Sequence, residues 1–119
     1  MDDDAGPRSR LRQELARGEA ELAQLERDHA GLIRASESSN ADDEHDPEGA
    51  TIAFEREQLV SIMSSVRRTV AELRQALTDL DEGRYGRCTG CGEPIDPARL
   101  EVRPQARTCV ACAGGSRSR

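Results

Sequence analysis

Apolar residues recur at helical spacing along two long stretches of the chain. In residues 8–36 they follow one another at alternating steps of four and three, which is the spacing of a coiled-coil seam. Pro7 lies just before this stretch, and proline is tolerated in the first turn of a helix. We therefore predict a helix over residues 8–36. Its seam positions are Leu11, Leu15, Gly18, Leu22, Leu25, His29 and Leu32, of which Gly18 and His29 are weak.

A second stretch, from about Thr51 to Glu82, has the same periodicity. One column recurs every seven residues and a companion column follows it four residues later, so this stretch also predicts a helix. Gly83 offers a stop, because glycine readily adopts the left-handed conformation that ends many helices. The first column is Ile52, Leu59, Val66, Leu73 and Leu80, the companion column is Met63, Val70 and Leu77, and Ala53, Ile62 and Ala76 widen the stripe.

The apolar stripe on each predicted helix needs a partner. The two seams are similar in length and adjacent in sequence, so the second helix can fold back on the first as an antiparallel coiled-coil hairpin, roughly 43 Å long. The alternative is that the seams join two copies of the chain. Intramolecular pairing is the simpler outcome, and it predicts a monomer.

Composition favours an elongated helical molecule over a large globular core. Of the 119 residues, 35% are apolar and 34% are charged, and aromatic residues make up 2%. The net charge of −6 is uneven: residues 1–82 carry 10 Arg against 20 acidic residues, and residues 83–119 carry 7 Arg against 3. The acidic majority argues against a general DNA-binding protein. The basic end leaves open a zinc ribbon that binds nucleic acid, although Arg84, Arg87, Arg99 and Arg107 are interpreted as a solvated basic face.

Four cysteines in two C-x2-C pairs predict a metal site. The pairs are separated by 17 residues, a spacing typical of tetrahedral zinc ribbons. Gly90 and Gly92 supply backbone conformations that other residues resist. Four thiolates leave no coordination position for water, so we predict one structural Zn²⁺ and not a redox dithiol. The predicted ligands are Cys88, Cys91, Cys109 and Cys112.

These patterns predict a mainly α protein, with a long antiparallel two-helix coiled-coil hairpin and a small C-terminal zinc-ribbon module built on the four cysteines. We expect a disordered N-terminus over residues 1–7, the hairpin over 8–82 with an acidic tip at 37–50, the zinc-finger module over 83–113, and a flexible tail over 114–119. The sequence has neither a membrane-spanning stretch nor a secretory signal, which predicts a cytoplasmic protein. It offers no nucleophile with a base and no phosphate-binding loop, so we do not expect an enzyme.

The predicted connector between the helices is acidic. Residues 40–49 read "NADDEHDPEG" and contain neither Lys nor Arg. The simplest interpretation is a solubilising loop. The other is that its carboxylates act on a partner, and the candidates are Asp42, Asp43, Glu44 and Asp46.

The segment over residues 83–113, "GRYGRCTGCGEPIDPARLEVRPQARTCVACA", closely resembles the C4 zinc-finger signature of the DksA/TraR family. With the helical hairpin and the acidic tip included, the resemblance covers about residues 8–113. The shared elements are Tyr85-Gly86, Cys88-x-x-Cys91-Gly92, Ile95, Arg99-Leu100-Glu101, Arg103-Pro104 and Cys109-x-x-Cys112.

This resemblance implies a transcription regulator that binds bacterial RNA polymerase, as core or holoenzyme, without sequence-specific DNA binding. It implies that the coiled coil enters the secondary channel and that the zinc module docks on the outside of the enzyme. The acidic tip residues Asp42, Asp43, Glu44 and Asp46 would then approach the active centre and modulate initiation. A coiled-coil adaptor for another protein, with a passive tip, remains the alternative.

The tip departs from the family pattern. The best-studied members carry two aspartates three residues apart and an alanine two residues further on. When Asp46 is aligned with the first aspartate, Gly49 and Thr51 occupy the other two positions. When Asp43 and Asp46 are taken as the two aspartates, Glu48 replaces the alanine, so the tip is variant in either alignment. The direction of the effect on initiation therefore does not follow from the resemblance.

A second departure concerns the nucleotide guanosine tetraphosphate, which some members bind together with polymerase. Arg103 matches one of the basic residues used for it, whereas Glu72 and Ala113 stand where lysines are expected. An anionic nucleotide loses two charge partners, so we expect weak or no response to it. Outside such a role, Arg103 would pair with Glu101 or brace the zinc module.

Overall fold

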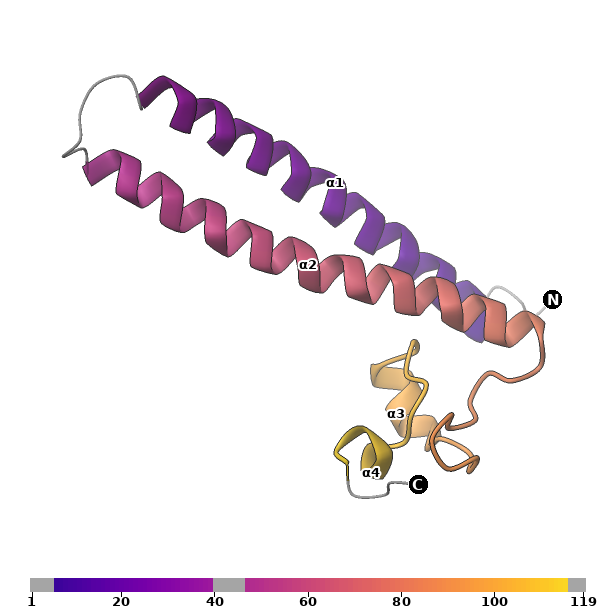
Figure 1. The fold of residues 1–119 in the computed structure, drawn as a ribbon. Coiled ribbons are helices and arrows are strands. Elements are labelled where there is room, and N and C mark those ends of the chain that lie inside the picture. The colour runs from indigo at the N-terminus through magenta and orange to yellow at the C-terminus, as the bar shows by residue number, and fades with distance from the viewer. Residues whose placement is uncertain (1–5, 40–46, 116–119) are drawn as a thin grey trace. The chain divides into compact units, whose positions relative to one another are not determined.

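The protein is mainly α, with two long helices followed by two short ones (Figure 1). The computed structural model describes residues 6–39 and 47–115. Within these ranges no strand forms, and a single isolated antiparallel bridge joins Arg87 to Pro94. The predicted fold class is confirmed. The helices are α1 (Pro7–Ser39), α2 (Pro47–Asp81), α3 (Pro97–Val102) and α4 (Val110–Ala113).

Three of the helices begin at a proline, namely Pro7, Pro47 and Pro97. Proline suits the first helical position because its fixed φ is already helical and its missing N–H would have no partner there. Accordingly α2 begins four residues before the predicted start at Thr51. It ends at Asp81, two residues before Gly83, whose φ of +78° turns the chain out of the helix.

The chain divides into two compact units. One is Gly18–Arg68, and the other combines α1 as far as Arg17 with the chain from Thr69 onward. In the latter unit, Leu11 of α1 and Leu73 of α2 are completely or almost completely buried, and Ala76 is buried beside them. Leu15, Leu77, Leu80 and Tyr85 pack against this cluster. The predicted seams therefore face each other within one chain.

In the unit Gly18–Arg68, the two helical segments also run antiparallel (Figure 1). Arg67 Nη2 lies 3.3 Å from Glu26 Oε2, and Met63 is buried. The prediction that Ala53 and Ile62 widen the apolar stripe is wrong, because both are exposed. A helix with a single neighbouring helix buries only a narrow face, and these two residues lie outside it. The α1 seam residues here are half-buried: Gly18, Leu22, Leu25, His29 and Leu32.

Neither long helix, within the described residues, has an apolar run that would allow it to cross a membrane.

Candidate metal centre

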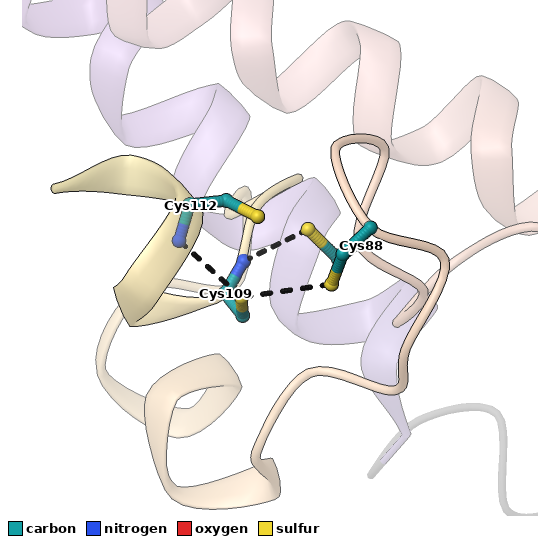
Figure 2. A group of neighbouring side chains, drawn as sticks. Cys88, Cys109 and Cys112 are labelled. Carbon is teal, nitrogen blue, oxygen red and sulfur yellow. Dashed lines mark hydrogen bonds between the residues drawn. The ribbon is translucent and has the colours of Figure 1, made fainter. Parts of the chain in front are cut away.

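The four cysteines predicted as ligands come together in one cluster. Their Sγ atoms all lie within 4.8 Å of one another. Figure 2 shows Cys88 facing Cys109 and Cys112, which come from a segment about 20 residues further along the chain. Cys88 is buried, and the other three are partly buried. The two C-x2-C pairs therefore form a single site.

The first pair lies in a tight turn held by backbone hydrogen bonds. The Gly92 N–H donates to the carbonyl of Cys88 at 2.9 Å, and the Cys88 N–H donates to the carbonyl of Glu93 at 2.8 Å. Gly92 has a φ of +81°, which favours glycine as predicted. Gly90 is needed for a different reason. A Cβ atom there would lie 3.0 Å from the sulfur of Cys112, so the residue is small because the sulfurs approach it closely.

The second pair is positioned by α4. Cys109 is the N-cap residue of this helix, and its sulfur accepts a hydrogen bond from the N–H of Cys112 at 3.5 Å. The N–H of Cys109 in turn donates to the sulfur of Cys88 at 3.3 Å, so it links the two pairs (Figure 2). The N–H of Gly90 donates to the same sulfur at 3.3 Å. Backbone N–H groups thus point at the positions where thiolate charge is needed.

These hydrogen bonds give the cysteine thiols different pKa values. The N–H of Cys109 is the main cause that lowers the pKa of Cys88 to about 6. The N–H of Cys112 likewise lowers the pKa of Cys109. Burial, followed by the neighbouring sulfurs, raises the pKa of Cys112 to about 12. The backbone N–H groups therefore favour the thiolate forms of Cys88 and Cys109, while Cys112 needs a bound cation to lose its proton near neutral pH.

The cluster fits a tetrahedral zinc ion. Zinc–sulfur bonds of about 2.3 Å place tetrahedral sulfurs about 3.8 Å apart, and the sulfurs of Cys91 and Cys109 lie 3.9 Å apart. All four ligands are thiolates, so zinc in this centre is structural: it joins the turn after Tyr85 to α4. Such a centre offers no open position for a substrate.

A small apolar core supports the metal centre. Ile95 and Ala106 are buried, and the hydroxyl of Tyr85 donates to the carbonyl of Pro104 at 2.8 Å. Burial raises the pKa of Tyr85, which keeps the hydroxyl protonated as a donor. Tyr85 also packs against the cluster around Leu11. One aromatic side chain therefore connects the helical core to the loop between α3 and α4.

Asp79 is a buried carboxylate that the sequence interpretation missed. It lies in α2, is 5% exposed, and accepts hydrogen bonds from three side chains. Arg107 Nε donates at 2.8 Å, Arg84 Nη2 at 2.9 Å and Gln75 Nε2 at 3.1 Å. Arg107 lies two residues before Cys109, so this Asp79 cluster ties α2 to the metal centre. An aspartate within a helix is usually solvated, and only the surplus of arginines after Gly83 hinted at a buried acidic partner.

The interpretation of the module's arginines as a solvated face holds only in part, because Arg84 and Arg87 are exposed but all four guanidiniums also donate hydrogen bonds within the chain. Arg84 and Arg107 bind Asp79, Arg99 Nε donates to the carbonyl of Thr108 at 2.9 Å, and Arg87 Nη1 donates to the carbonyl of Gly92 at 2.8 Å. Two of these guanidiniums thus hold the carboxylate of Asp79 in α2, and the other two hold backbone carbonyls of the module.

The structure pairs Arg103 with Glu72, whose Oε1 lies 3.8 Å from its Nη2, and does not pair it with Glu101. Both side chains are partly exposed. The other predicted functional residues, Asp42, Asp43, Glu44 and Asp46, lie outside the described residues.

Replacement of Asp79 by Asn should lower the free energy of unfolding of the zinc-loaded protein by about 1–3 kcal/mol. Burial raises the pKa of Asp79, but its hydrogen bonds to Arg107, Gln75 and Arg84 outweigh this, and the pKa lies below the ordinary value of 3.8. A lowered carboxyl pKa gives stability that is complete above the unfolded value and lost as pH falls through the folded value. The difference between the two proteins in urea unfolding should therefore stay constant from pH 8 to pH 5.

Asp81→Asn is a matched control, because Asp81 lies in the same helix and pairs with Arg8 at 2.6 Å but is well exposed. An exposed ion pair contributes about 0–1 kcal/mol. Equal losses for the two variants would contradict the assigned role of Asp79.

The comparison with known proteins agrees with this geometry. Residues 83–117 match the profile of the prokaryotic dksA/traR C4-type zinc finger. The chain is 46% identical over 44 residues to the RNA polymerase-binding transcription factor DksA of Caulobacter vibrioides, a match that covers 37% of this chain and 31% of that protein. It is 32% identical over 74 residues to general stress protein 16O of Bacillus subtilis, which covers 62% of this chain and 45% of that protein. The chain thus spans about a third to a half of these relatives.

A solved structure covers more of the chain. Transcription factor DksA2 of Pseudomonas aeruginosa superposes with a TM-score of 0.73 at 25% identity, over 92% of this chain and 78% of that one. The likeness therefore extends from the zinc finger to the long helices.

Proposed function

Because the chain belongs to the DksA/TraR family of C4-type zinc-finger proteins, we propose that it regulates transcription by binding RNA polymerase. The observation that carries this proposal is the likeness in fold to transcription factor DksA2, which takes in 92% of the chain. The closed four-cysteine centre fits such a role, because it stabilises a binding module and offers no site for catalysis. The protein would act in the cytoplasm and without chemistry of its own.

We infer further that the two long helices enter the secondary channel of the polymerase and carry the acidic residues towards its active centre. Asp42, Asp43, Glu44 and Asp46 belong to the segment that connects α1 to α2, so a helix pair that enters loop-first would present them. Carboxylates in that position would interact with Mg²⁺ or with basic residues that handle phosphates.

The surroundings of Arg103 support a weak response to guanosine tetraphosphate. Its guanidinium is paired with Glu72, and a hollow beside it is also lined by Arg10, Glu14 and Glu101. Arg10 is already engaged, because its Nη2 donates to the carbonyl of Glu101 at 2.6 Å. An anionic nucleotide would thus meet carboxylates and occupied guanidiniums, which disfavours its binding.

Binding to core polymerase and the lifetime of open promoter complexes test the proposal. The protein should bind core polymerase and change these lifetimes, and guanosine tetraphosphate should change the effect little. Steeply salt-dependent binding to free DNA or RNA, without polymerase binding, would instead favour a nucleic-acid-binding zinc ribbon. Polymerase binding with unaltered lifetimes would indicate a coiled-coil adaptor with a passive tip.

A further inference from the structure

Burial is uneven along the two long helices. In the unit Gly18–Arg68, Met63 is the one buried residue among those whose side chains the structure describes. The seam leucines of this unit are only half-buried, namely Leu22, Leu25, Leu32 and Leu59. In the other unit Leu11 and Leu73 are 0% and 2% exposed, and Tyr85 packs against their cluster from outside the helix pair. The unit Gly18–Arg68 therefore gains less stability from apolar burial.

Gly31 weakens α1 within this unit without a steric need for glycine. It lies inside the helix, and its φ is not positive. A Cβ atom there would have Arg34 Nη2 as its neighbour at 3.9 Å, which is an ordinary contact, so alanine would fit. Glycine is unfavourable in a helix interior because it loses the most backbone entropy on folding.

The adjoining ends of α1 and α2 have weak helix signals as well. The last turn of α1 contains Glu37 and no basic residue, and a negative charge there opposes the helix dipole. Serines flank Glu37 on both sides, and Gly49 lies in the first turn of α2, so helix propensity is low in both places. These ends lie next to each other in the antiparallel pair (Figure 1). We call residues 31–39 of α1 and 47–59 of α2 the distal segment.

We propose that the distal segment opens as a separate local unit while the rest of the chain stays folded, and that Gly31 sets how often it opens. Parts of a protein with few buried apolar contacts open at a lower free energy than its core. The metal centre and the Asp79 cluster belong to the other unit, so this opening requires no loss of zinc. The connector, residues 40–46, joins the distal segment at both ends, so each opening would release its attachment points. The inference rests on burial and helix propensity and is independent of the proposed function.

Amide hydrogen exchange in the full-length, zinc-loaded protein tests this inference. In the wild type, amides of the distal segment beyond the first turn of α2 should exchange at least about tenfold faster than those around Leu73, because local opening exposes them without global unfolding. Gly31→Ala should slow exchange in the distal segment about fivefold, because alanine favours the helix and fits the space. The exchange around Leu73 should stay unchanged in this variant.

Two exposed alanines of α1 provide matched controls. Ala30→Gly lies next to Gly31 and should accelerate exchange in the distal segment about fivefold. Ala16→Gly makes the same change in the other unit and should alter that exchange by less than about twofold, because the two parts open separately. Equal exchange rates along both helices, or equal responses to the two glycine variants, would show that the helix pair opens as a whole and would overturn the inference. Unchanged exchange in Gly31→Ala would overturn the role assigned to Gly31.

Discussion

Removal of zinc by a strong chelator should unfold residues 84–112 and leave most of the helical signal in place. The module has few buried apolar side chains besides the cysteines, chiefly Ile95 and Ala106. Such a core cannot offset the conformational entropy of about 30 residues. Structural zinc sites contribute on the order of 10–16 kcal/mol in small zinc-finger peptides, so metal binding supplies much of the folding free energy here.

Limited trypsin digestion measures this effect residue by residue. Arg87, Arg99 and Arg107 each donate a hydrogen bond within the folded module or to Asp79, and chelation should expose all three to cleavage. Arg27 and Arg67, which lie in α1 and α2, serve as internal controls whose cleavage should change little. Added Zn²⁺ should restore protection. Unchanged resistance of the module without metal would contradict the expected dependence.

Circular dichroism gives an independent readout of the same experiment. The described residues hold 68 helical positions in α1 and α2 but only ten in α3 and α4. Loss of the module therefore removes a small fraction of the helical signal. A collapse of most of that signal on chelation would mean that the long helices depend on the metal centre, through contacts such as that of Tyr85 with the cluster around Leu11.

The sequence predicted the long helices well because their heptad seams repeat a single physical rule over many turns. Leu11, Met63, Val70 and Leu73 are buried as the seam requires. The same rule failed for Ile62, because apolar character alone does not tell whether a residue next to the seam faces a neighbouring helix. With a single neighbour the buried face is narrow, and the position beside it reaches solvent.

The cysteine ligands were also predictable, because their spacing encodes the turn geometry that a tetrahedral ion requires. The partners of Asp79 were not. Gln75 is four residues away on the same helix, but Arg84 follows the end of α2 and Arg107 lies 28 residues further along the chain. Such a cluster depends on tertiary contacts, which a periodic pattern in the sequence does not predict.

The pairing of Arg103 with Glu72 shows the same limit, since the two residues are far apart in sequence and the local candidate was Glu101. The sequence shows that Glu72 stands where family members carry a lysine, but it did not predict that Glu72 pairs with Arg103. The contact adds a physical reason to expect a weak response to guanosine tetraphosphate. Glu72 replaces the positive charge of a lysine, and its carboxylate also pairs with the guanidinium of Arg103.

Replacement of Asp42, Asp43, Glu44 and Asp46 together by Asn should abolish the effect on initiation while leaving polymerase binding largely intact. The affinity is expected to come from the flanks of α1 and α2 and from the zinc module, and these residues belong to neither. Their carboxylates are expected to act on charge near the catalytic centre, and Asn has no charge, although it matches the shape of Asp and is one methylene shorter than Glu44. Binding should be measured with core polymerase, and the effect as the lifetime of open promoter complexes.

A second variant with the same change in net charge separates this local effect from a general one. Glu19, Glu21, Glu55 and Glu57 are four exposed acidic residues of α1 and α2, and their replacement by Gln also removes four charges. This control should retain the effect on initiation, because exposed charges more than a Debye length of about 8 Å from the catalytic centre are screened. If both variants lost the effect equally, net charge and not the connector would set the activity. If the Asn variant kept full activity, the tip would be passive.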